Sequence, residues 1–152
     1  MKNILLPCIF VLMFATIASA AHNFGAGFIL GDPSGLTAKI FMGKSDAIDI
    51  GIGESADDLY IYADYLRHFH GVFPINELVF YLGVGAGFHD WEKDRKNDHD
   101  EENRIDVRIP VGLEYTFTKV PVGIFIELVP ALRIIPDVDF DIRGGLGARY
   151  YF

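Results

Sequence analysis

The sequence predicts an all-β protein, an eight-stranded antiparallel up-and-down transmembrane β-barrel preceded by a cleavable signal peptide. Three observations predict this fold class. Segments of about ten residues alternate between apolar and polar side chains, and turn residues separate these segments. In addition, glycine and charged residues share one face of the alternation, which is the arrangement of a strand between unlike media.

The first twenty residues have the three parts of a secretory signal peptide. Lys2 gives a basic start, the stretch Ile4–Ile17 is apolar, and residues 18–20 (Ala-Ser-Ala) are the small residues of a cleavage site. We therefore expect residues 1–20 to be removed and residues 21–152 to form one barrel domain. An uncleaved membrane helix is the alternative, but the apolar run is shorter than the ~20 residues that span a bilayer.

The chain is acidic, with 21 Asp and Glu against 13 Lys and Arg. This balance argues against a nucleic-acid partner, because phosphate binding needs a basic patch. The single cysteine, Cys8, lies in the predicted signal peptide, so we expect neither a disulfide nor a thiolate metal site in the barrel. No apolar run after residue 20 reaches the length of a membrane helix, so membrane insertion has to use strands.

Turn residues divide the remaining chain into eight expected strands. Glycine, proline, aspartate and asparagine mark most of these turns, as in the run Gly-Asp-Pro-Ser-Gly over residues 31–35. The longest polar stretch, Asp90–Asn103, is expected to form a loop at the end opposite the termini. The expected strands are Phe24–Gly31, Leu36–Met42, Ala47–Gly53, Asp58–Phe69, Glu77–His89, Arg104–Phe117, Val122–Ile134 and Asp139–Phe152.

Alternation alone does not tell which face of the strands lies outside. A soluble lipocalin-like periplasmic barrel, with an apolar ligand inside, is the alternative to a membrane barrel. Glycine on the charged face suits a narrow, crowded interior, and large aromatic residues stand near the strand ends on the apolar face, as in Phe69 and Phe117. We therefore predict that the apolar face contacts lipid and that the charged face lines the lumen.

The inward charges are the candidate site. Counting registers from the turns places Lys39 opposite Asp49, and places Arg133 between Asp106 and the last strand. We expect these ions to neutralise one another and to plug a lumen too narrow for bulk water, with a narrow ion path as the alternative. The full predicted set is Lys39, Asp49, Asp64, Asp106, Arg108, Glu114, Glu127, Arg133, Asp139, Asp141, Arg143 and Arg149.

Catalytic residues are not expected. Nucleophilic catalysis needs a serine and a histidine within hydrogen-bond reach, yet Ser34, Ser45 and Ser55 lie in predicted turns. His68 and His89 face inward at opposite ends of the barrel, and no His and Ser share a strand face. The sequence therefore predicts a protein that is not an enzyme and holds no cofactor.

The loop Asp90–Asn103 is rich in carboxylates but lacks the spacing and central glycine of an EF-hand. We expect a solvated loop without a bound metal ion, and an extracellular partner would bind there. Two prolines, Pro110 and Pro130, fall inside predicted strands and close to each other in the expected register. Because proline removes a ladder donor, we predict a β-bulge at that place.

The mature chain resembles the small eight-stranded outer-membrane barrels of the OmpA transmembrane-domain type. The terminal Arg-Tyr-Tyr-Phe, with Tyr150 and Phe152 as alternate aromatics, matches the assembly signal of that family. The segments GDPSGLTAK, ADYLRHF, RIPVGLEY and GGLGARYYF are similar to an uncharacterised family of short barrel proteins. The resemblance implies a place in the cell outer membrane, with membrane lipid and the barrel-assembly machinery as partners. It implies no assigned activity, so the predicted function is a structural or surface-interaction role.

Overall fold

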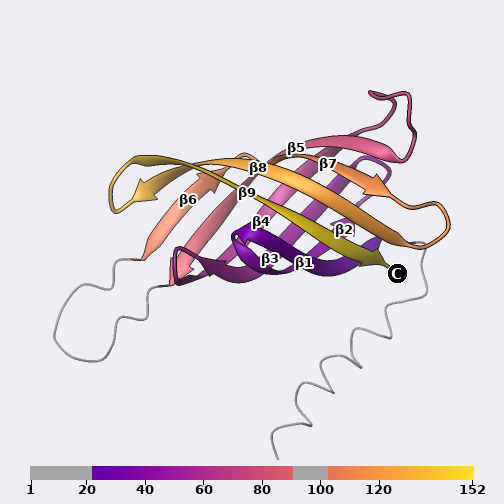
Figure 1. Cartoon of the computed structure of the whole chain (residues 1–152). Coiled ribbons are helices and arrows are strands. Elements are labelled where there is room, and N and C mark those ends of the chain that lie inside the picture. Colours follow the sequence, from indigo (N-terminus) through magenta and orange to yellow (C-terminus); the bar gives the residue numbers. More distant parts are fainter. Residues whose placement is uncertain (1–21, 91–102) are drawn as a thin grey trace, which may run out of the picture.

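Residues 22–90 and 103–152 are described by the computed structural model, and they form one sheet of nine strands (Figure 1). The predicted signal peptide and positions 91–102 of the predicted acidic loop lie outside the described residues. Within the described ranges, no helix is long and apolar enough to cross a membrane. The strands are β1 (Phe24–Asp32), β2 (Ser34–Phe41), β3 (Asp46–Ser55), β4 (Asp58–Phe69), β5 (Leu78–Asp90), β6 (Arg104–Arg108), β7 (Val111–Thr116), β8 (Val122–Ile135) and β9 (Asp139–Tyr151).

Antiparallel pairing runs around the whole sheet and returns to its start. Each of β1 to β4 pairs with the next strand, β5 pairs with both β6 and β7, and these two short strands pair with β8. The last strand, β9, pairs with β8 and also with β1, from Gly25 opposite Tyr151 to Asp32 opposite Gly144. This ring of pairings confirms the predicted all-β, antiparallel, up-and-down barrel.

The predicted sixth strand is two strands, because the ladder is interrupted at Ile109 and Pro110. The predicted bulge at this place is wrong: Arg108 pairs with Ala131 and Val111 with Leu128, so the register is the same on both sides. No residue is inserted at the prolines. The irregularity in the pairing of this segment lies earlier, between Ile105 and Asp106.

The interruption follows from the hydrogen bonds that proline cannot make. Ile109 N–H donates to the Pro130 carbonyl at 2.9 Å, but Pro130 has no N–H to return a bond. Gly83 N–H donates to the Pro110 carbonyl at 2.8 Å, and again the return bond has no donor. At each proline, one of the two backbone hydrogen bonds of the ladder is formed and the other is missing. The strand nevertheless continues in the same direction, without an extra residue.

Several turns are tighter than the sequence predicts. Only Pro33 separates β1 from β2, and only Ala56 and Asp57 separate β3 from β4. Ala56 and Asp57 have φ values of 51° and 68°, which is the left-handed pair of a two-residue hairpin turn. Such turns are normally signalled by Asn-Gly or Asp-Gly, so this chain offered no clear signal for a two-residue turn.

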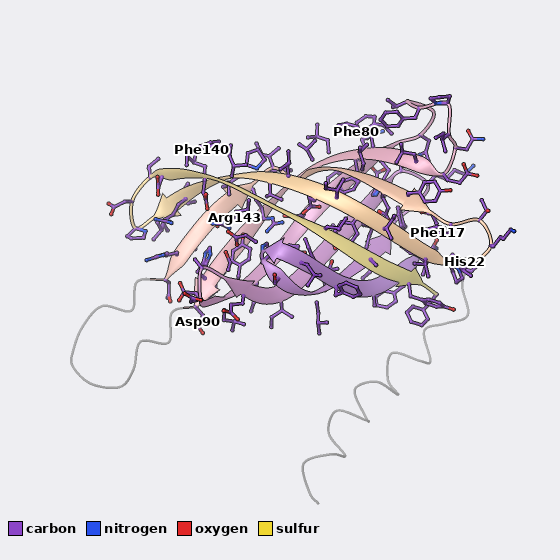
Figure 2. All side chains as sticks on the ribbon, in the orientation of Figure 1. His22, Phe80, Asp90, Phe117, Phe140 and Arg143 are labelled. Carbon is purple, nitrogen blue, oxygen red and sulfur yellow. The ribbon has the colours of Figure 1, made fainter. Side chains whose placement is uncertain are left out.

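The two faces of the wall differ as predicted from the period of two. On β4 every second residue from Tyr60 to His68 is buried, and those between are exposed. Tyr60, Tyr62 and Asp64 lie on the buried face, whereas Leu59 and Ile61 lie on the exposed face at 45% exposure each. Tyr65 and Arg67 also lie on the exposed face. Figure 2 places Phe80 and Phe117 toward the end that holds the termini, and Asp90 at the opposite end. We refer to these as the terminal end and the far end.

Candidate functional site in the barrel interior

Nine of the twelve predicted lumen charges are buried, and none of these nine is more than 4% exposed. They come from all parts of the ring except β1 and β5, whose inward face is largely glycine. The nine are Lys39, Asp49, Asp64, Asp106, Arg108, Glu114, Glu127, Arg143 and Arg149.

The remaining three members of the predicted set lie at the far-end mouth, which corrects the prediction. The Arg133 and Asp139 side chains are 27% and 64% exposed and stand 3.6 Å apart. The Asp141 side chain is 51% exposed, and its Oδ2 lies 3.1 Å from Arg143 Nε. Parity put all three on the inward face, but they lie near the ends of β8 and β9 that meet at the far-end turn, where the lumen opens to solvent.

Arg149 and Lys39 organise the ion cluster nearer the terminal end. Arg149 Nη2 donates to Asp49 Oδ2 at 2.7 Å and to the Thr37 hydroxyl at 3.0 Å. Lys39 Nζ forms an ion pair with Glu114, and Arg149 Nη1 lies 3.9 Å from the same carboxylate. This cluster therefore contains two cations and two carboxylates, all buried in the barrel.

Arg108 organises the second cluster. Its Nε lies 2.9 Å from Asp64 Oδ1, and its Nη2 lies 3.6 Å from Glu127 Oε1. Its Nη1 donates to the Tyr60 hydroxyl at 3.1 Å, and that hydroxyl donates to Asp106 at 2.9 Å. The Arg108 guanidinium thus lies next to two buried carboxylates, and the Tyr60 hydroxyl links it to a third, that of Asp106.

The strand register and the ion pairing differ. Lys39 lies directly opposite Asp49, as counting from the turns placed it. Yet the carboxylate that pairs with Lys39 is Glu114 on β7, and Asp49 pairs with Arg149 on β9. The pairs therefore cross the lumen between strands that are not neighbours.

Tyrosines and a phenylalanine complete the network, and reasoning from charge alone missed them. Tyr81 donates to Glu127 Oε2 at 2.8 Å, and Tyr151 donates to Glu114. The guanidinium of Arg149 stacks on the Phe125 ring, with its central carbon 3.8 Å from the centroid. These aromatic residues stand at alternating positions on the same strand face as the charged residues and the glycines. That pattern in the sequence could have predicted their place in the network.

Inward glycines leave the space that these side chains occupy. A Cβ at Gly112 would lie 2.3 Å from the Tyr81 ring, and one at Gly85 would lie 1.9 Å from Asp64 Oδ1. Gly85 stands between Asp64 and Arg108 across three strands, and Gly112 stands between Tyr81 and Glu127. Each glycine lets the side chains of its two neighbouring strands meet over it.

No metal-binding geometry is found among the residues that the structure describes, since no group of three or more His, Cys, Asp and Glu side chains is arranged to hold an ion. His68 lies beside Lys39, with 3.2 Å between Nε2 and Nζ. His89 Nδ1 lies 3.8 Å from Asp106 Oδ2. Both histidines are therefore neighbours of the ion network at its two ends.

A closed antiparallel barrel with a charged interior and an apolar outer wall has the architecture of small outer-membrane barrel domains. In agreement, the chain is similar to the N-terminal β-barrel domain of Pseudomonas aeruginosa OprF, with a TM-score of 0.66. The two are 19% identical, and the match covers 85% of this chain and 95% of that domain, so the likeness shows the fold. The chain belongs to the family described as "Protein of unknown function (DUF3996)", whose model matches residues 16–139. No curated protein matches the chain.

Proposed function

We propose that the chain is an integral outer-membrane protein whose barrel spans the membrane and whose lumen is plugged by the buried ion network. In this proposal it has a structural or surface-interaction role and is not an enzyme. The barrel-assembly machinery recognises Tyr150 and Phe152, and an extracellular partner binds at the loop Asp90–Asn103.

The observation that carries the proposal is the apolar outer wall. Large apolar side chains are exposed on several strands of the ring, with Leu36 on β2 66% exposed, Leu128 on β8 62% and Ile142 on β9 62%. Exposed apolar patches on soluble proteins rarely exceed a few hundred Å². A lipocalin-like barrel has a polar outer wall and an apolar interior, whereas this barrel has an apolar outer wall and a charged interior. An apolar outer wall is stable in contact with lipid.

Aromatic side chains support a membrane interface at the terminal end. The Phe24 and Phe152 ring centroids are 5.9 Å apart, and those of Tyr115 and Phe117 are 5.1 Å apart. Paired aromatics at one level resemble the girdles that mark membrane interfaces. The far end is acidic and carries Asp32, Glu54, Asp57, Asp58, Asp90, Asp137, Asp139 and Asp141.

The plug is supported by burial and by the cross-lumen pairs. Removing one partner of a buried pair leaves an uncompensated charge, so such a network holds its members in place. A narrow cation path is the second candidate. The buried set of the described residues has five carboxylates (Asp49, Asp64, Asp106, Glu114, Glu127) against four cations (Lys39, Arg108, Arg143, Arg149), which favours cations over anions as the passing ion.

The histidine and serine contacts support a role without catalysis. His68 Nδ1 lies 3.2 Å from the backbone carbonyl of Ser45, which is not the hydroxyl that a nucleophile would use. The Ser55 hydroxyl donates to Asp32 at 2.5 Å near the far end, away from His68. A base and a nucleophile are thus not brought together at these positions.

Two measurements test the proposal. We expect the protein to stay in the membrane pellet after sodium-carbonate extraction and to migrate differently on gels before and after heating. Release into the soluble fraction would contradict membrane insertion. In planar bilayers we expect no unitary conductance. Cation-selective conductance steps would contradict the plug and favour the narrow ion path.

A further inference from the structure

The connection between β4 and β5, residues 70–77, is the longest connection that lies wholly within the described residues. It joins strands at the terminal end, where outer-membrane barrels usually have short turns. The other complete connections at this end are residues 42–45 and 117–121. Its length therefore calls for an explanation beyond joining two strands.

The tip of this connection is apolar and exposed. Val72 is 58% exposed and Ile75 is 49% exposed. Residues 71–76 (Gly-Val-Phe-Pro-Ile-Asn) carry no ionisable side chain, whereas the neighbouring connections carry Lys44 and Lys119. Exposed apolar side chains are costly to leave in water.

The backbone holds this tip in a defined place. Leu78 N–H donates to the Ile75 carbonyl at 3.2 Å, and Thr116 N–H donates to the Glu77 carbonyl at 3.0 Å. The second bond ties the β5 side of the connection to β7. In Figure 1 the connection stands off the end of the barrel beside β5, rather than folding across the mouth.

The apolar outer wall reaches the base of this connection. Phe69 and Phe80 are directly opposite each other at the base of the connection, with ring centroids 5.8 Å apart. Phe69 is 38% exposed on the outer face. The exposed Phe69 of the outer wall thus stands at the base of a connection whose tip bears Val72 and Ile75, and the ionisable residues His70 and Glu77 flank the uncharged stretch.

We propose that residues 71–76 lie on the membrane surface, with Val72 and Ile75 inserted at the boundary between headgroups and acyl chains in the leaflet at the terminal end. This inference rests on the proposed membrane insertion of the barrel and adds a second kind of lipid contact to it. Stable protein–protein interfaces bury about 1,200–2,000 Å², which two apolar side chains and a short uncharged tip do not offer. A lipid surface needs no such area, because apolar groups insert singly.

Tryptophan fluorescence in lipid vesicles tests the inference. Trp91 is the single tryptophan of the chain, so Trp91→Phe gives a background without it. In that background, Val72→Trp reports on the tip, Ile126→Trp on the middle of the outer wall, and Lys44→Trp on a neighbouring charged turn. Each variant is folded into phosphatidylcholine vesicles with or without bromine on the acyl chains. We expect bromine to quench Val72→Trp and Ile126→Trp strongly and Lys44→Trp weakly.

The three positions separate the inference from the function on which it rests. If Ile126→Trp is quenched but Val72→Trp behaves like Lys44→Trp, the tip does not touch lipid and the inference is wrong while membrane insertion stands. If Ile126→Trp is not quenched, the proposed membrane function itself fails. Val72→Trp that becomes shielded only as the protein-to-lipid ratio rises would indicate contact between copies, which also contradicts a lipid contact.

Discussion

Replacing Arg149 by methionine gives the most direct test of the plug. Arg149 is 1% exposed, and the change removes its 2.7 Å bond to Asp49 while keeping a long apolar side chain against Phe125. Asp49 would then be a buried carboxylate without its cation, which costs about 3–5 kcal/mol in measured cases. With a urea slope of about 2 kcal/mol/M, the unfolding midpoint of the barrel should fall by roughly 2 M.

The assay is urea unfolding of the barrel in detergent micelles, followed by heat-modifiable gel mobility. The control is Arg133→Met, since the partner of Arg133, Asp139, is 64% exposed and an exposed ion pair contributes about 0–1 kcal/mol. Combining Arg149→Met with Asp49→Leu removes one charge of each sign, so stability should be largely recovered. The reasoning is refuted if Arg149→Met costs no more than Arg133→Met, or if the double variant is no better than the single one.

Two further predictions concern assembly and the inward glycines. Phe152→Ala should lower the yield of assembled barrel in cells several-fold, whereas Phe140→Ala, at the other end of the same strand, should not; equal yields would refute an assembly signal at the terminus. Gly85→Ala should destabilise the barrel by about 1–3 kcal/mol, because the added Cβ would lie 1.9 Å from Asp64 Oδ1. The outward substitution Ala86→Val is the control in the same urea assay, and a harmless Gly85→Ala would show that the lumen has spare room.

The fold could be predicted because a strand wall has a simple period. Every second residue shares a face, so apolar and charged residues separate in the sequence as they do in space. The register of β2 and β3 also followed from the sequence, since the polar turn at residues 42–45 sets which residues are opposite. Strand period and turn length are set by residues close together in the chain, so a single sequence is enough to predict them.

The ends of strands were predicted less well for physical reasons. Parity placed Arg133 and Asp141 on the inward face, but it does not tell how far along the barrel the lumen remains closed. At Pro110 the sequence showed a missing donor and could not show how the strand responds, whether by an inserted residue or by leaving a bond unmade. The structure leaves the bonds unmade and keeps the register.

The partners of the buried ions were the least predictable part, because they depend on which strands face each other across the lumen. Neighbouring strands suggested Lys39 with Asp49, yet Lys39 pairs with Glu114 on β7, far along the ring. The inward glycines explain part of this pattern: Arg108 and Asp64 meet over Gly85, on the strand between them. A glycine has no side chain to separate second-neighbour strands, so at Gly85 a carboxylate on β4 can reach the guanidinium on β6. Glycines on the charged face therefore do more than make a narrow barrel possible, since Gly85 also allows an ion pair to form between strands that are not neighbours.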